Sequence, residues 1–222
     1  MRPRAVVLTA MLCTAGSAAA QVQTAESQAA MTPAAALAKL REGNARFVAN
    51  TPRARDWSKK VAATAAGQYP FAAVLSCMDS RAPVEIVFDQ GVGNVFSLRV
   101  AGNVVNDDEL GSLEYAVKVG VKLIVVLGHT QCGAVKGAID GVELGNLTGL
   151  LAKIQPSVSA AHCSDQKSDA CVQSVAEENV RESTREIRAR SPYLAKALDA
   201  GQIELAGAMY DVATGKVSFL SK

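Results

Sequence analysis

The chain has few of the residues on which many catalytic and binding sites depend. Among 222 residues there are two histidines, His129 and His162, and aromatic side chains make up 5%. It contains no C-x-x-C pair, which argues against thioredoxin-like thiol exchange. Gly91-x-Gly93 lacks the third glycine and the following helix of a dinucleotide fingerprint. Beyond residue 20 no apolar run approaches the length of a transmembrane helix, so we expect no membrane contact in the mature protein.

The charge distribution excludes a further class of partner. Lysine and arginine number 23, and aspartate and glutamate 21. Arg2 and Arg4 lie within the first 20 residues, which contain no acidic residue. The rest of the chain therefore carries 21 basic and 21 acidic side chains, a net charge near zero. Without a basic stripe, we expect no nucleic-acid partner.

The first 20 residues have the parts of a Sec signal peptide. Arg2 and Arg4 form the positive region, Ala5 to Cys13 the apolar region, and Ala18-Ala19-Ala20 a cleavage site before Gln21. A lipoprotein anchor at Cys13 is disfavoured, because Leu12 is too bulky for the small residue that precedes the cysteine of a lipobox. We expect cleavage after Ala20 and a periplasmic or secreted protein.

Apolar runs alternate with amphipathic stretches through the body of the chain. Strands are predicted at 71–75, 95–100, 121–128, 203–210 and 216–220. Helices are predicted at 33–48, 109–119, 146–155 (ended by Pro156) and 172–190, with two more starting at 133 and 191. This order predicts a single α/β domain over residues 33–222. Its central, mostly parallel β-sheet is flanked by helices, with an N-terminal helical arm at 33–48.

The segment between the leader and the first predicted strand leaves alternatives open. Residues 21–32 are rich in Gln, Ala, Ser and Thr and predict a flexible tether. The helix opened by Pro33 has Leu37 and Phe47 on one side and Arg46 outward. The residues alone indicate a surface element packed on its own domain, whereas the family resemblance described below implies an arm that crosses onto a partner subunit. In the polar stretch 51–68, Trp57 is the only large anchor.

Two short stretches carry the predicted chemistry. Cys77 follows the first predicted strand, and His129 and Cys132 follow the third. Because ligands of parallel α/β folds bind at the carboxyl ends of strands, these side chains should meet. Two thiolates and one imidazole suit zinc, and three protein ligands leave a fourth position for water, as in catalytic sites. Asp79 and Arg81 alternate with Cys77 and should point to the same side.

These motifs resemble those of the β-class carbonic anhydrases, whose signature is C-x-D-x-R followed after about fifty residues by H-x-x-C. The chain has CMDSR at 77–81 and HTQC at 129–132. The resemblance begins near Ala34, in AAALAKLREGNARFV, and closes with IELAGAMYDVATGKVSFL. It implies an enzyme with one Zn²⁺ per chain that reversibly hydrates CO2 to bicarbonate and a proton. It also implies a homodimer or a higher homo-oligomer.

The resemblance assigns catalytic roles to Asp79 and Arg81. Arg81 would hold Asp79 ionised through charge-assisted hydrogen bonds. Asp79 would accept a hydrogen bond from the zinc-bound hydroxide and so orient the hydroxide toward CO2. The proton released by the reaction would leave through buffer, His162 or a surface carboxylate.

Four further residues are implied to bind substrate. Gln68 would hydrogen-bond the substrate, and the Gly133 N–H would donate near a substrate oxygen. Phe96 and Tyr115 would line a small apolar pocket, although plain core packing explains these two equally well. In the family this pocket lies at the subunit interface.

Other functions fit parts of the same pattern. A COS or CS2 hydrolase could use the same scaffold with altered access to the pocket. A non-catalytic zinc-binding or thiol-redox protein is a third alternative. Asp79 and Arg81 argue against it, since a purely structural zinc site needs neither residue.

Two cysteines lie outside the zinc motif. Cys163 and Cys171 bracket the mostly polar segment 164–170. Export would place them in an oxidising compartment, so we expect a disulfide between them. The alternative is two free thiols, one of them buried against the helix that follows.

Overall fold

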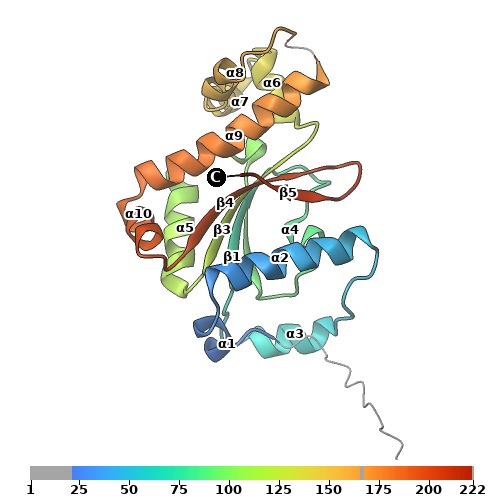
Figure 1. The fold of residues 1–222 in the computed structure, drawn as a ribbon, viewed down its shortest axis with the longest axis vertical. Coiled ribbons are helices and arrows are strands. Elements are labelled where there is room, and N and C mark those ends of the chain that lie inside the picture. Colours follow the sequence, from blue (N-terminus) through green and yellow to red (C-terminus); the bar gives the residue numbers. More distant parts are fainter. Residues whose placement is uncertain (1–21, 166–167, 222) are drawn as a thin grey trace, which may run out of the picture.

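A five-stranded sheet forms the centre of the molecule (Figure 1). The structure, a computed structural model, describes residues 22–165 and 168–221. The predicted signal peptide, 1–20, therefore lies outside the described residues. The strand order is β2-β1-β3-β4-β5, in which β1 to β4 are parallel and β5 is antiparallel to β4. The strands are β1 (Ala72–Ser76), β2 (Val95–Arg99), β3 (Leu123–His129), β4 (Glu204–Tyr210) and β5 (Val217–Phe219). The predicted strands and the mostly parallel sheet are confirmed.

Helices lie on both faces of the sheet and beyond both of its ends. They are α1 (Ala25–Ala29), α2 (Pro33–Val48), α3 (Trp57–Thr64), α4 (Val84–Val87), α5 (Asp107–Val119), α6 (Gly133–Ile139), α7 (Gly145–Leu151), α8 (Gln155–Ala160), α9 (Asp169–Arg190) and α10 (Pro192–Asp199), with a 3-10 turn, η1, at Ala101–Asn103. Among the described residues, no helix has the length and apolar character needed to cross a membrane.

Alternate residues of the strands bury into two separate cores, as the pleat requires. Ala73 and Leu75 of β1 join the core under α5, α6, α9 and α10. Ala72 and Val74 join the core under α2 and α4. Both faces of β1 and β3 are therefore buried, which explains why these strands read as continuous apolar runs.

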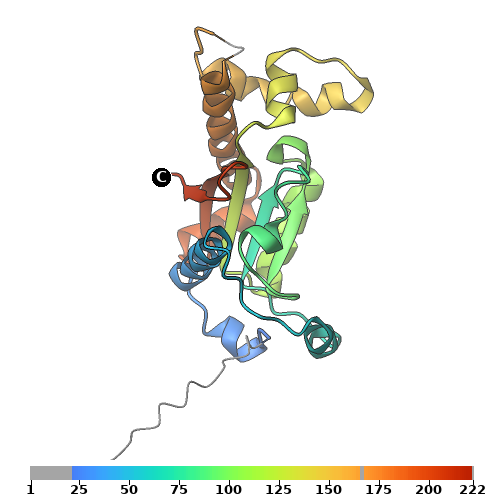
Figure 2. The ribbon, with the colours of Figure 1, turned by 90° about the vertical axis from the view of Figure 1, so that its right-hand side faces the viewer.

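The two ends of the sheet carry different helices. Figures 1 and 2 show α6, α7 and α8 with one end of α9 beyond one end of the strands, and α1 and α3 beyond the other. Since α6 directly follows β3, the first group lies at the carboxyl ends of the parallel strands. Since α3 precedes β1, the second group lies at the amino ends. We call these the carboxyl edge and the amino edge.

The predicted flexible tether is wrong for residues 25–29, which form α1. Thr24 caps this helix in a reciprocal capping box with Ser27. The buried Gln28 donates its Nε2 hydrogen to the carbonyl of Pro70 over 2.7 Å, which fixes the helix to the chain entering β1. The polar composition of the segment thus provides caps and a tertiary contact.

The predicted arm at 33–48 is helical but does not extend away from its domain. Ala36 and Leu40 of α2 are fully buried against the sheet. Asn44, also buried, donates to the carbonyls of Val87 and Gly215 and accepts from the Val217 N–H. A helix whose buried polar residue is satisfied within its own chain is part of that domain. Of the two interpretations, packing on its own domain is the one that the structure shows.

A close backbone approach reinforces this packing. A Cβ added to Gly43 of α2 would lie 1.8 Å from the carbonyl oxygen of Phe88, so no larger residue fits there. On the same helix, Arg46 does not point outward as predicted. It pairs with Asp89 over 2.6 Å.

Two smaller predictions, on Trp57 and Pro156, are wrong. Trp57 does not anchor its segment: its side chain is 55% exposed and it begins α3, which Asp56 caps through the Lys59 N–H. Pro156 does not mark the end of a helix. It lies in the first turn of α8, where its missing N–H costs nothing.

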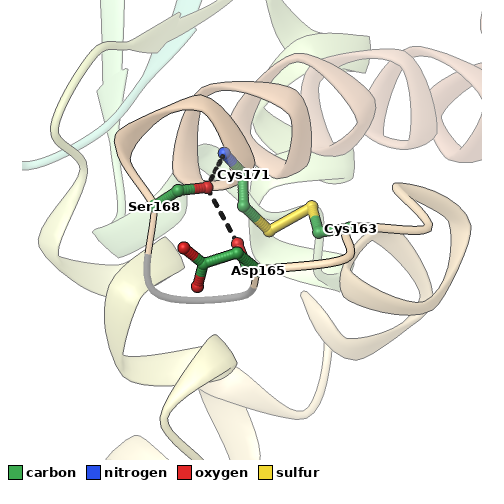
Figure 3. The surroundings of a disulfide bond; sticks show 4 residues. All are labelled: Cys163, Asp165, Ser168 and Cys171. Atoms are coloured by element: carbon green, nitrogen blue, oxygen red, sulfur yellow. Dashed lines mark hydrogen bonds between the residues drawn. A yellow bond between two sulfur atoms is a disulfide. The ribbon is translucent and has the colours of Figure 1, made fainter.

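The structure contains the predicted disulfide between Cys163 and Cys171 (Figure 3). The two Cα atoms are 5.6 Å apart, and the structure has a disulfide here rather than the alternative of two free thiols. Ser168 caps α9 by accepting from the Cys171 N–H, and its hydroxyl donates to the Asp165 carbonyl. The disulfide thus closes the loop that leads into α9.

Candidate metal centre

Three predicted ligands meet at the carboxyl edge of the sheet. Cys77 follows the last residue of β1, and His129 ends the adjacent parallel strand β3. Cys132 is the N-cap residue of α6, three residues further on. The donor atoms of the three side chains all lie within 4.8 Å of one another. The structure therefore brings together a donor set that the sequence separates by up to 55 residues.

Burial and hydrogen bonding prepare these donors for a cation. Cys77 is 5% exposed, and His129 and Cys132 are 1% exposed each. His129 Nδ1 lies 2.9 Å from the Thr130 carbonyl, which fixes the ring and directs Nε2 toward the cysteines. Within the described part of the chain, Nε2 is buried without a hydrogen-bond partner. A buried orphan nitrogen beside two thiols fits a metal ligand.

The two thiols are electrostatically unequal. A hydrogen bond from the Cys132 thiol lowers the pKa of Cys77 to about 4, and the Gly102 N–H, 3.3 Å from Cys77 Sγ, contributes. The same contact raises the pKa of Cys132, which burial raises further. Cys77 is therefore the more acidic of the two thiols, and a soft or borderline cation would favour ionisation of both.

Asp79 lies beside the donors and is held by Arg81. The Arg81 side chain donates from Nε and Nη2 to the two carboxylate oxygens of Asp79 over 2.9 and 2.8 Å, and its backbone N–H also donates. These bonds hold the pKa of Asp79 well below its usual range. Asp79 Oδ2 is 3.8 Å from His129 Nε2. An ionised, oriented carboxylate therefore borders the donor cluster.

Three residues that the sequence analysis did not single out support this site. Arg99, at the end of β2, donates to the carbonyls of Asp79 and Cys77 over 2.6 and 3.3 Å. Gly102 adopts a φ of 69°, which turns its N–H toward Cys77 Sγ. The buried Asn179 of α9 donates to the Gly102 carbonyl over 2.7 Å. Arg99 could have been found from its place at a strand end, but nothing local marks Asn179.

The predicted substrate residues divide into two groups. Gly133, the first residue of α6, lies next to Cys132, is exposed, and has no atom within 4 Å of where a Cβ would be. Phe96 pairs in register with Ala73, about 13 Å along the strand direction from Cys77. Its ring is 6.0 Å from that of Tyr115, and both line a hollow on the β2 side of the sheet.

Gln68 also lies away from the metal donors. It is exposed in the segment that leads into β1, at the amino edge. A single chain therefore assembles the metal donors, Asp79, Arg81 and Gly133. It does not add Gln68, Phe96 or Tyr115 to them.

The fold and the site define a class of protein. A parallel α/β sheet that presents two cysteines, one histidine and an ionised aspartate at its carboxyl edge has the donor set of a catalytic zinc enzyme. A structural zinc site would normally have four protein ligands, and the Asp79 carboxylate is instead engaged by Arg81.

Comparison with known proteins narrows this class to one family. The family model described as carbonic anhydrase matches residues 72–217. Carbonic anhydrase 2 of Mycobacterium tuberculosis is 38% identical over 191 residues, 83% of this chain and 91% of that protein. A carbonic anhydrase of Mycolicibacterium smegmatis is 38% identical over 193 residues, 85% of this chain and 94% of that protein.

Solved structures agree. A β-carbonic anhydrase of Aspergillus fumigatus superposes with a TM-score of 0.68 at 28% identity, covering 85% of this chain and 90% of that chain. A tetrameric β-carbonic anhydrase of Sordaria macrospora gives a TM-score of 0.65 at 26% identity, covering 74% of this chain and 91% of that chain. The chain belongs to the β-class carbonic anhydrases.

Proposed function

We propose that the protein binds one zinc ion through Cys77, His129 and Cys132 and catalyses the reversible hydration of CO2 to bicarbonate and a proton. One observation carries the proposal. Buried donor atoms of the three residues lie within 4.8 Å of one another, and the carboxylate of Asp79 borders them. No observation on the described residues favours COS or CS2 as the substrate.

The chain's own residues position the reactants. When bound, zinc is a Lewis acid that lowers the pKa of a water molecule toward neutrality. Asp79, ionised and fixed in one orientation by Arg81, accepts a hydrogen bond from the nucleophile and directs its lone pair toward the carbon of CO2. The Gly133 N–H lies in the first turn of α6, where N–H groups have no partner within the helix, and could donate to a substrate oxygen.

The decisive experiment compares metal content and CO2 hydration in the same preparations. Stopped-flow hydration is measured on the wild-type protein and on Cys132→Ser, with zinc determined by elemental analysis. We expect the substitution to remove most of the zinc and the activity together, because a hydroxyl is a poor replacement for a thiolate ligand. Full zinc occupancy in Cys132→Ser would contradict the ligand assignment.

We further propose that the working enzyme is a homodimer or a larger assembly. Gln68, Phe96 and Tyr115 lie away from the metal donors of their own chain, so a second chain would have to bring them to the site. The similarity to a tetrameric relative supports this proposal. Sedimentation of the zinc-loaded protein at micromolar concentration tests it. A fully active monomer would contradict it.

We also propose that the chain is exported to the periplasm or beyond, after cleavage following Ala20. The disulfide between Cys163 and Cys171 supports an oxidising destination. N-terminal sequencing of protein recovered from the periplasm tests this proposal. An intact N-terminus on protein found only in the cytoplasm would contradict it.

A further inference from the structure

A second concentration of polar side chains lies at the amino edge, away from the metal donors. It is a hollow of about 480 Å³ between α1, α2, α3 and the chain at Asp89–Asn94. We call it the amino-edge pocket. Its volume falls within the range of small-molecule sites. The cationic side chains that line it are Lys39, Arg46, Arg53, Arg55 and Lys60.

The charges of the pocket do not balance. Five cations face two carboxylates, Glu42 and Asp89, which leaves a formal excess of three positive charges. Asp89 is already shared: it pairs with Arg46 over 2.6 Å and with Arg55. Its negative charge is therefore offset by two guanidinium groups before any other cation is considered.

Lys39 and Lys60 each lie close to another positively charged side chain of the pocket. Burial, followed by the charge of Arg53, lowers the pKa of Lys39. Burial, followed by the charge of Arg55, lowers the pKa of Lys60. Among the described residues, no hydrogen bond or ion pair engages the Arg53 side chain. Like charges held together in a hollow are destabilising on their own, and a bound anion would relieve the repulsion.

An unpartnered donor points to the same conclusion. Gln23 is 8% exposed and lines the pocket. Its Oε1 accepts from Lys39 Nζ over 3.4 Å, whereas its Nε2, buried, has no hydrogen-bond partner in the part of the chain that the structure describes. A buried amide N–H without an acceptor is destabilising unless one is supplied. An anion placed beside Lys39 would supply that acceptor.

We propose that the amino-edge pocket binds a small, multiply charged oxyanion of the phosphate type, through Gln23, Lys39 and Arg53. The binding groups are reached through a hollow and include a side chain that is nine-tenths buried, which suits a small ligand rather than a flat polymer or membrane surface. Inorganic phosphate and compact organic phosphates share this chemistry. The site lies at the opposite edge from Cys77, His129 and Cys132, so the proposal is independent of the proposed reaction.

The test is phosphate-dependent stabilisation of the zinc-loaded protein. Thermal unfolding and calorimetric titration are carried out with inorganic phosphate, with sodium chloride at matched ionic strength as the reference. Arg53→Gln removes one charge from the pocket. Lys59→Gln, on the exposed side of α3, removes one charge outside it. We expect phosphate to raise the melting temperature, Arg53→Gln to weaken its affinity about tenfold, and Lys59→Gln to leave it unchanged.

A second variant tests whether the phosphate effect arises at Gln23. Gln23→Glu is close in shape and places a carboxylate beside Lys39. We expect it to raise the melting temperature without phosphate and to abolish the phosphate-dependent rise. The proposal is overturned if phosphate has no effect, or if its effect survives Gln23→Glu. A rise that disappears only with Cys132→Ser would place the anion at the metal donors and would also overturn it.

A parallel titration with glycerol 3-phosphate separates the two sources of the ligand. Binding that is at least tenfold tighter than that of inorganic phosphate would assign the pocket to organic phosphates. Equal or weaker binding would assign it to the inorganic ion. Both results support a phosphate-type site.

Discussion

Two aspartates ten residues apart each bind arginine, and they do so for different ends. Asp79 pairs with Arg81 at the carboxyl edge, where the aspartate side chain is 16% exposed and the arginine 51%. Asp89 pairs with Arg46 and Arg55 near the amino edge, where the aspartate is 2% exposed and both arginines are largely covered. The same kind of ion pair therefore stands in two different environments.

The difference shows what an ion pair contributes in each place. Exposed pairs add little to the free energy of unfolding, so the value of the Asp79 pair lies in the orientation of a carboxylate beside the metal donors. A buried pair that loses one partner leaves charges without compensation, so the Asp89 cluster is a structural element. We expect the two carboxylates to separate activity from stability when each is replaced.

The largest effect is expected for Asp89→Asn. The substitution leaves Arg46 and Arg55 largely buried without their counter-charge, and should lower the free energy of unfolding by about 3–5 kcal/mol. Urea denaturation monitored by circular dichroism measures this. The zinc content of the folded fraction should stay at the wild-type level. A loss below about 1 kcal/mol would mean that water reaches the cluster and compensates it.

Asp79→Asn should instead lower activity and leave stability nearly unchanged. An amide can donate a hydrogen bond to the nucleophile and misorient it, so kcat/KM for CO2 hydration should fall about 100-fold. Zinc content and the urea midpoint should remain near those of the wild type. Activity close to the wild-type value would reduce Asp79 to a structural partner of Arg81 and erase the contrast with Asp89.

The disulfide sharpens the comparison, because it is a covalent link at the carboxyl edge, the same edge of the sheet that holds Asp79. The double variant Cys163→Ser/Cys171→Ser should lose roughly 2–3 kcal/mol of unfolding free energy, the chain-entropy value for a short loop. Zinc content and CO2 hydration should be retained. Loss of zinc would show that the start of α9 is coupled to the Asn179 contact with Gly102.

The smallest effect is expected from acid, which should reduce the stabilising contribution of Asp89. Burial opposes ionisation of Asp89, but hydrogen bonds from Arg55 and Arg46 outweigh it and lower its pKa. A lowered pKa means that the stabilisation is present above the unfolded-state pKa of about 4 and is lost as pH falls below it. The stability difference between wild type and Asp89→Asn should therefore narrow below about pH 4. A constant difference from pH 7 to pH 3 would contradict this.

The sequence predicted the carboxyl edge well because its signals are local. Cys77 and His129 each follow a buried apolar run, so a rule about strand ends was enough to place them together. Arg99 obeys the same rule and was overlooked only because no motif includes it. Asn179 could not have been found, since its contact with Gly102 spans 77 residues of the chain.

The amino edge was predicted poorly for the opposite reason. The pocket takes its charges from α2, the segment between α2 and α3, α3 and the chain around Asp89, which are far apart in the sequence. The helix at 25–29 was missed within the predicted tether 21–32, because a polar composition does not distinguish helix caps from linkers. Arg46 read as solvent-facing because its partner lies 43 residues away.

Asn44 joins parts of the chain that are made at very different times. Its amide and carbonyl groups bond the Gly215 carbonyl and the Val217 N–H, 171 and 173 residues further on. During synthesis α2 is complete long before β5 exists, so one edge of the core that it shares with the sheet must wait for the last residues of the chain. Contacts of such long sequence separation slow folding, because the loop between them must close before the contact stabilises it. A chain truncated before Val217 should therefore retain secondary structure but lack the cooperative unfolding transition of the complete protein.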